Sequence, residues 1–423
     1  MTRSNTPSKW PSRFWVTAVL FLSVVGPGII TANVDNDAGG IYTYSLAGAR
    51  FGYTLLWTLV PITVALVVTQ EMVARMGAVT GKGLADLIRE EYGFRITFLL
   101  MTCLLVADLG NTVAEFAGLA SGAAALHISR FISVPLGALF VWLLVVRGTY
   151  RIVERVFLVA CFFYVSYLLS GFLAHPDWSL ALVSTVKPTV SFDRASIYMI
   201  IGLVGTTIAP WMQFYLQSAV VEKRVTVSQY AYSRWDVIIG CIITDVVAFF
   251  IIVACAATLY VTGHHDVRNA ADAAVALRPL AGRAASILFA FGLCNASLFS
   301  ASILPLATAY YVCEGLGFEA GIDQRVHEAP VFYTLYTGLI ACGALTVLLI
   351  PERMQVPIIL LSQVANGVLL PFVLIFMLRL CNREDLMGAH RNTKPLNIIA
   401  WTSSVLMIGM TLVLVFLSFG PTP

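Results

Sequence analysis

The sequence predicts an all-α polytopic membrane protein of eleven transmembrane helices, with breaks in the first and the sixth. Hydrophobic residues make up 59% of the chain and charged residues only 12%, and the mean hydropathy is +0.84. Apolar runs long enough to cross a bilayer recur along the whole chain. Polar and helix-breaking residues lie inside two of these runs and predict the breaks. The continuous runs exclude the alternating pattern of an outer-membrane barrel.

The apolar segments are joined by polar connections that are too short to form a second domain. We therefore expect a single transmembrane domain over 1–423. We place the segments at about 14–48, 54–76, 96–125, 131–147, 152–174, 195–222, 234–262, 281–311, 329–350, 356–380 and 396–419.

Lysines and arginines are distributed unequally between alternate connections. With the N-terminus inside, eighteen of the 26 basic residues fall in the inner segments. This bias predicts a cytoplasmic N-terminus in the cell membrane, and the odd number of helices then places the C-terminus outside. The eight cysteines are scattered through apolar runs without a CxxC pair or a Cys/His cluster, as small buried hydrophobes are.

The first segment contains the polar stretch ANVDNDAGGIY at 32–42. A charged side chain in the bilayer is costly, so such residues usually face a cavity and mark an ion path. Glycines Gly39 and Gly40 let the helix unwind, and unwinding frees backbone carbonyls beside the carboxylate of Asp37. We expect a cation site at this break. The side chain of Asp35 would point to another side of a helix and could equally sit in a water-filled vestibule.

The sixth segment contains a second helix-breaking pattern, at the matching position of the second half of the chain. Pro210 removes a backbone donor and clashes with the preceding turn, so the helix should break near 208–209. Paired breaks predict two inverted five-helix repeats, at about 14–174 and 195–380, with the site between them. The segment at 396–419 is then one extra helix.

Longer motifs resemble the start of the NRAMP (natural resistance-associated macrophage protein) metal-ion transporters. They are GPGIITANVDNDAGGIYTYSLAGARFGYTLLW followed by QEMVARMGAVTGKGLADLIREEYG. The likeness continues through NTVAEFAG in the third segment to LLSQVANGVLLPF in the tenth. The resemblance implies a LeuT-like transporter fold with broken first and sixth helices.

The sequence departs from the family pattern at both breaks. The family's DPGN motif, whose Asp and Asn bind the metal, corresponds to Asp37, Ala38, Gly39 and Gly40 here. The family's Met-Pro-His motif corresponds to Ala209, Pro210 and Trp211, so the thioether ligand is absent. These changes keep the aspartate of the family's first motif and remove the asparagine and methionine ligands.

Hard Mg²⁺ prefers oxygen ligands and retains several waters, whereas a thioether favours softer ions such as Mn²⁺. The departures at Gly40 and Ala209 therefore resemble those of the NRAMP-related magnesium transporters. Two family positions linked to proton movement hold Gln217 and Thr112, although Glu115 is kept. We expect import of Mg²⁺, and of Mn²⁺ as well, by alternating access without proton coupling. The alternative is a proton-coupled transition-metal importer of the NRAMP type.

Two glutamines on other segments can contribute to the site. Gln213 and Gln363 offer amide oxygens from the sixth and tenth segments, either to an ion and its waters or as hydrogen bonds between helices. We assign the metal site to Asp37, Gly40, Ala209, Gln213 and Gln363. We also expect that at least one other intramembrane acid lines the ion path, and the candidates are Glu71, Asp108, Glu115 and Asp245.

Other function classes fit less well. A membrane enzyme would need a catalytic constellation, and the sequence contains no HExxH, GxSxG or Ser/His/Asp grouping. A channel does not need paired breaks, and an amino-acid transporter would aim a half-helix N-terminus at a substrate carboxylate. We expect a monomer in the lipid bilayer that uses no cofactor, binds no nucleic acid and has a divalent metal ion as its transported partner.

Overall fold

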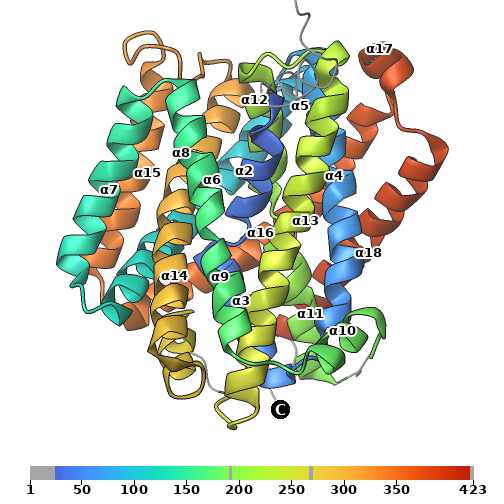
Figure 1. Cartoon of the computed structure of the whole chain (residues 1–423). Coiled ribbons are helices and arrows are strands. Elements are labelled where there is room, and N and C mark those ends of the chain that lie inside the picture. Colours follow the sequence, from blue (N-terminus) through green and yellow to red (C-terminus); the bar gives the residue numbers. More distant parts are fainter. Residues whose placement is uncertain (1–23, 190–192, 266–269, 420–423) are drawn as a thin grey trace, which may run out of the picture.

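A computed structural model of the chain describes residues 24–189, 193–265 and 270–419 (Figure 1). The described residues form helices and their connections, without a strand. Gly282, with a φ of 86°, divides α14 into two helices across a kink. The helices are α2 (Pro27–Val34), α3 (Ala38–Phe51), α4 (Leu59–Thr80), α5 (Leu84–Tyr92), α6 (Phe94–Ala125), α7 (Arg130–Arg147), α8 (Tyr150–Phe163), α9 (Val165–Leu173), α10 (Trp178–Val186), α11 (Arg194–Thr207), α12 (Pro210–Glu222), α13 (Tyr230–Cys255), α14 (Ala270–Leu316), α15 (Pro330–Leu349), α16 (Glu352–Cys381), α17 (Glu384–Met387) and α18 (Lys394–Phe419).

The predicted transmembrane segments coincide with these helices. Among the described residues, 8 helices are long and apolar enough to span a membrane, or 9 if the bent pair at the end of α16 and α17 forms one span. The halves α2 and α3 of the first segment are each too short for that test, and residues 14–23 of the segment lie outside the described part. An interruption at Tyr164 between α8 and α9 was not predicted.

Both predicted breaks are present. The first helix stops at Val34 and resumes at Ala38, and the sixth stops at Thr207 and resumes at Pro210. Proline is favoured at the first position of a helix because its missing N–H would have no partner there. Both breaks are therefore confirmed, but Gly39 and Gly40, which were expected to unwind, lie in the first turn of α3, and the residues outside the helices are 35–37.

Helix α2 is held tightly against α13. The carboxylate of Asp236 accepts hydrogen bonds from the backbone N–H groups of Gly26 (3.1 Å), Gly28 (2.7 Å) and Ile29 (3.3 Å), at the start of α2. A Cβ added at Gly28 would lie 2.6 Å from the backbone nitrogen of Val237, so only glycine allows this approach. The backbones of α2 and α13 are therefore in close contact, and the Asp236 side chain bonds the start of α2 to α13.

The remaining helices pack around α2, while α13 also presents a face to the outside of the molecule (Figure 1). Helix α13 also packs against α3 and α4, and α12 packs against α4. On the other side of the first break, α6 packs extensively against α14, α15 and α16. The extra helix α18 contacts α16, α4 and α11 at the edge of the molecule. The two breaks therefore lie between the group around α13 and the group around α6.

Candidate metal-ion site

The first break places two carboxylates at the start of α3. Asp37 is the N-cap of α3, and its Oδ1 accepts a hydrogen bond from the Gly40 N–H at 2.6 Å. Glu115, on α6, accepts a bond from the Ala38 N–H at 3.3 Å and is 1% exposed. The positive end of the helix dipole favours negative charge at this point. Asp37 is less buried than Asn36 and Ala38 on either side of it.

Gly40 contributes space and a backbone N–H to the site. A Cβ at this position would lie 2.5 Å from the carbonyl oxygen of Asp35 and 3.4 Å from Oδ1 of Asp37. The absence of a side chain therefore lets the unwound backbone fold back against α3. Where the family's motif carries an asparagine, this chain has a close backbone contact.

The second break adjoins the first because α3 packs against α11 and α2 against α12. The hydroxyls of Tyr44 on α3 and Thr207 on α11 lie 2.7 Å apart and connect the two broken helices. Ala209 is the N-cap of α12 with an extended backbone and is 8% exposed, so it offers a methyl group and no ligand side chain.

Gln213 lies one helical turn beyond Ala209. Its side chain is completely buried, and neither its amide nitrogen nor its amide oxygen has a hydrogen-bond partner. A buried amide without partners is costly, so it is expected to meet a ligand or an ordered water. The predicted residue Gln363 is on α16, and its side chain lies outside the described part of the structure.

The donor set around the breaks is dominated by oxygen. Among the described residues, no three His, Cys, Asp or Glu side chains are placed to hold a metal ion together. The described oxygens at the first break are the carboxylates of Asp37 and Glu115, and the unpartnered amide of Gln213 lies one turn beyond the second break. This composition suits a hard cation that keeps part of its hydration shell.

The intramembrane acids fall into different environments. Asp108 on α6 is fully buried and accepts hydrogen bonds from Asn111 (2.8 Å), Thr308 (3.1 Å) and Tyr311 (3.0 Å). Glu71 on α4 accepts a hydrogen bond from the Tyr230 hydroxyl and lies 3.4 Å from Arg75. Asp108 is satisfied by protein groups, whereas Oε2 of Glu71 has no hydrogen bond and only the ion pair with Arg75. Of the four candidates, Glu115 accepts a hydrogen bond from the backbone at the first break.

Asp35 and Asp245 are buried, with 2% and 5% of their surface exposed, and their carboxylate oxygens have no hydrogen-bond partner. The expectation that Asp35 could sit in a water-filled vestibule is therefore wrong in this structure. It faces the protein interior because the break turns it toward α13 instead of toward α6.

The two positions that hold proton-linked groups in the family have structural partners here. The amide of Gln217 donates to the carbonyl of Lys82 at 2.8 Å, and the hydroxyl of Thr112 donates to the carbonyl of Asp108 at 2.7 Å. Neither side chain can titrate. Gln70 on α4 was missed by the sequence analysis; it is 1% exposed and both of its amide atoms lack partners. A lone glutamine in an apolar run was the only signal.

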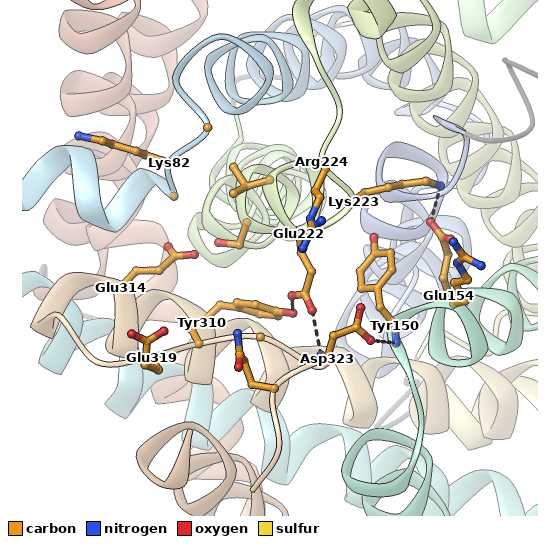
Figure 2. A pocket seen from close by; sticks show the side chains of 18 of the residues that line it. Lys82, Tyr150, Glu154, Glu222, Lys223, Arg224, Tyr310, Glu314, Glu319 and Asp323 are labelled. Atoms are coloured by element: carbon orange, nitrogen blue, oxygen red, sulfur yellow. Dashed lines mark hydrogen bonds and ion pairs between the residues drawn. The ribbon is translucent and has the colours of Figure 1, made fainter. Parts of the chain in front are cut away.

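A cavity of about 970 Å³ lies at the end of the molecule that carries α5 (Figure 2). It is lined by the end of α12, the start of α8, the end of α14 and the loop at 319–324. Burial raises the pKa of the Asp86 carboxyl on its wall, and the nearby Arg89 guanidinium opposes that rise. Acidic and basic side chains alternate around the wall.

Contacts around this cavity connect α12 to the surrounding helices. Lys223, just after α12, donates to Glu154 on α8 at 2.5 Å and to the carbonyl of Val25 at 2.6 Å (Figure 2). Glu222 accepts hydrogen bonds from the Tyr310 hydroxyl and from the backbone N–H of Ile322 (2.7 Å). The end of α12 is thus fastened to α8, α14 and the following loop.

The two broken helices, with a carboxylate and an orphan amide between them, define an inverted-repeat membrane transporter with a LeuT-like fold. Residues 28–417 match the family described as natural resistance-associated macrophage protein-like, and the chain belongs to that family.

Similar proteins cover nearly the whole chain. The divalent metal cation transporter MntH of Granulibacter bethesdensis is 27% identical over 427 residues, which cover 97% of this chain and 91% of that protein. MntH of Deinococcus radiodurans is 28% identical over 410 residues, covering 92% of this chain and 88% of that protein. A solved structure of the Eremococcus coleocola manganese transporter has a TM-score of 0.77 at 22% identity and covers 99% of this chain and 92% of its own. That likeness shows the fold.

Proposed function

We propose that this protein is a divalent-cation transporter that imports hydrated Mg²⁺, and also Mn²⁺, by alternating access without proton coupling. The observation that carries the proposal is the first break, where the carboxylate of Asp37 faces the site without a second ligand side chain at Gly40. The relatives are named as divalent metal cation and manganese transporters, which supports the same class of substrate.

The ligands favour a hard ion. With Ala209 at the second break there is no thioether, which is the ligand that would favour Mn²⁺ or Cd²⁺ over Mg²⁺. Mg²⁺ loses its waters reluctantly and is usually bound through one or two carboxylates. Asp37 supplies one carboxylate, Glu115 lies beside it, and the free amide oxygen of Gln213 can hold a water of the ion.

The proposal that transport is not coupled to protons rests on the missing histidine, although the carboxyl groups of Asp37 and Glu115 remain at the site. Coupling needs a titratable group that responds to ion binding, and histidine is the usual one. The sixth segment contains none, and Gln217 uses its amide to hold Lys82. The membrane potential alone supplies about 2.3 kcal/mol per charge per 100 mV, which is enough to drive a divalent cation inward.

The excess of basic residues in alternate connections supports an N-terminus in the cytoplasm and a C-terminus outside, in a cell membrane. The cavity beside α5 then opens on the cytoplasmic side, at the end of the molecule that carries α5 (Figure 1). The proposed unit is a monomer whose partners are the lipid bilayer and the transported ion.

The test is flux into liposomes that contain the purified protein and a trapped pH dye. We expect entry of Mg²⁺, competition by Mn²⁺, weak competition by Cd²⁺ and a constant internal pH. Acidification that follows metal entry and disappears in Asp37→Ala would establish the proton-coupled alternative. Exclusion of Mg²⁺ with ready entry of Cd²⁺ would overturn the proposed selectivity.

The matched control for Asp37→Ala is Asp177→Ala. Asp177 is the N-cap of α10 and accepts a hydrogen bond from the Leu180 N–H at 3.0 Å, so both variants remove the same kind of cap. Each should lose about 0.5–2 kcal/mol of stability. Only Asp37→Ala should abolish cation uptake, and normal uptake by the folded variant would refute the assignment of Asp37.

A further inference from the structure

Asp35 and Asp245 form a buried acidic pair on the side of the first break that faces away from α6. Asp35 lies between α2 and α3, and Asp245 lies in the middle of α13. The two side chains are 2% and 5% exposed, and none of their four carboxylate oxygens has a hydrogen-bond partner. Two unpartnered carboxyl groups in a membrane interior must either be protonated or be balanced by a cation.

Hydrogen bonds between Asn36 and Thr244, the residues next to the two acids in the sequence, hold the first break against α13. The amide of Asn36 donates to the carbonyl (3.1 Å) and the hydroxyl oxygen (2.9 Å) of Thr244, and the Thr244 hydroxyl donates to the carbonyl of Ala32 at 2.5 Å. The acids directly precede and follow this bonded pair, and their charges interact. The break is thereby fixed against α13 at the level of both carboxylates.

A second group beside the acids also lacks a partner. Asn36 is completely buried, and its amide oxygen accepts no hydrogen bond, although its nitrogen is fully used on Thr244. The Asn36 side chain bonds to Thr244, which directly precedes Asp245. The same place therefore holds two carboxylates and an amide oxygen, all of them acceptors without a donor.

The nearby hydroxyls send their protons elsewhere. Thr207 donates to the carbonyl of Leu203 (2.9 Å), so the hydroxyl of Tyr44 is the donor in its bond to Thr207. Thr63, which lies beside Asp245, donates to the carbonyl of Leu59 at 2.7 Å. The surroundings of the two acids therefore consist mainly of oxygen lone pairs, with the Cys241 thiol as a weak donor nearby, and a hard cation can use such a set of oxygens.

We propose that Asp35 and Asp245, with the amide oxygen of Asn36, form a second cation site that takes one divalent ion. One divalent ion balances both carboxylates, whereas a monovalent ion or a single shared proton leaves a buried negative charge. Protonation of both acids is the competing neutral state, and the metal count distinguishes it from a bound ion. The site differs from that of Asp37 in its ligands, because it uses Asp245 of α13 and does not use Glu115 of α6. The class of ion rests on the proposed function; the existence of the site does not.

The experiment counts metal ions bound to the purified full-length protein in detergent, with Mn²⁺ alone as the probe, by equilibrium dialysis with electron paramagnetic resonance of the free ion. We expect two Mn²⁺ per wild-type chain, one in Asp245→Asn, one in Asp37→Ala and none in the double variant. Asp108→Asn is the control, because that buried carboxylate is satisfied by three protein donors and should leave the count at two.

A wild-type count of one that Asp245→Asn leaves unchanged would overturn the second site, including the case in which the pair shares a proton. If Asp245→Asn fails to fold, Asp35→Asn tests the same charge from the other element. The result is independent of transport: loss of one ion in Asp245→Asn supports the second site even if Asp37→Ala still imports cations and the proposed function fails.

Discussion

Gly40→Ala tests the close contact at the first break. The added Cβ would lie 2.5 Å from the carbonyl oxygen of Asp35, about 0.9 Å nearer than the 3.4 Å at which ordinary contact begins. The obstacle is backbone, so the break itself must move. That movement would displace the Asp37 carboxylate, whose bond to the Gly40 N–H is 2.6 Å long.

The expected magnitude follows from the overlap. Overpacking of this kind costs about 1–3 kcal/mol. If the cost falls on the ion-binding arrangement, affinity for Mg²⁺ drops by roughly 5- to 150-fold. The better helix propensity of alanine recovers at most about 1 kcal/mol. Isothermal titration with Mg²⁺ and liposome flux at subsaturating Mg²⁺ measure the loss.

Gly205→Ala on α11 is the matched control. Nothing lies within 4 Å of a Cβ built at this position, so the same substitution in the other broken helix meets no obstacle. We expect unchanged Mg²⁺ affinity and slightly higher stability. Wild-type affinity in Gly40→Ala, or an equal loss in both variants, would refute the argument from the backbone contact.

Three further predictions concern the breaks and the contacts around them. Gly40→Asn with Ala209→Met should shift competition flux from Mg²⁺ toward Mn²⁺ or Cd²⁺, and an unchanged Mg²⁺ preference would place selectivity elsewhere. Lys223→Met leaves the carboxylate of Glu154 unpaired where the two side chains are 10% and 14% exposed. This variant should lose about 3 kcal/mol of stability in thermal melts. The double variant Lys223→Met with Glu154→Met should recover most of the lost stability. Asp236→Asn weakens three charge-assisted hydrogen bonds to α2 and should lower stability by about 1–3 kcal/mol. Amide hydrogen exchange at the start of α2 should become faster, and unchanged exchange would contradict this prediction.

The two breaks could be predicted from the sequence because their causes are local. Gly39, Gly40 and Pro210 disfavour a continuous helix wherever they stand in the fold. The apolar runs likewise predicted the helices, since the bilayer fixes their length. The interruption of the helix at Tyr164 was not predicted because neither a glycine nor a proline marks it in the sequence.

Relations between distant segments could not be predicted. Asp236 lies 210 residues from Gly26, whose N–H it accepts, and nothing in the composition of either segment indicates the other. The same holds for Asp35 and Asp245, which sequence analysis treated as separate acids. The orphan state of Gln213 and Gln70 depends on which helices surround them, because an amide is satisfied or left without a partner only by its neighbours.

The contacts of α2 explain why acids on either side of the first break can serve different purposes. Gly28 and Gly240 bring the backbones of α2 and α13 together, and a Cβ at Gly240 would lie 2.7 Å from the carbonyl oxygen of Gly28. Sliding one helix past the other would break this packing and the bonds to Asp236, so Asp35 and Asp245 are held at a fixed separation. Glu115 on α6 touches the same break through one bond of 3.3 Å to Ala38. A break that moves must therefore part from α6 before it parts from α13.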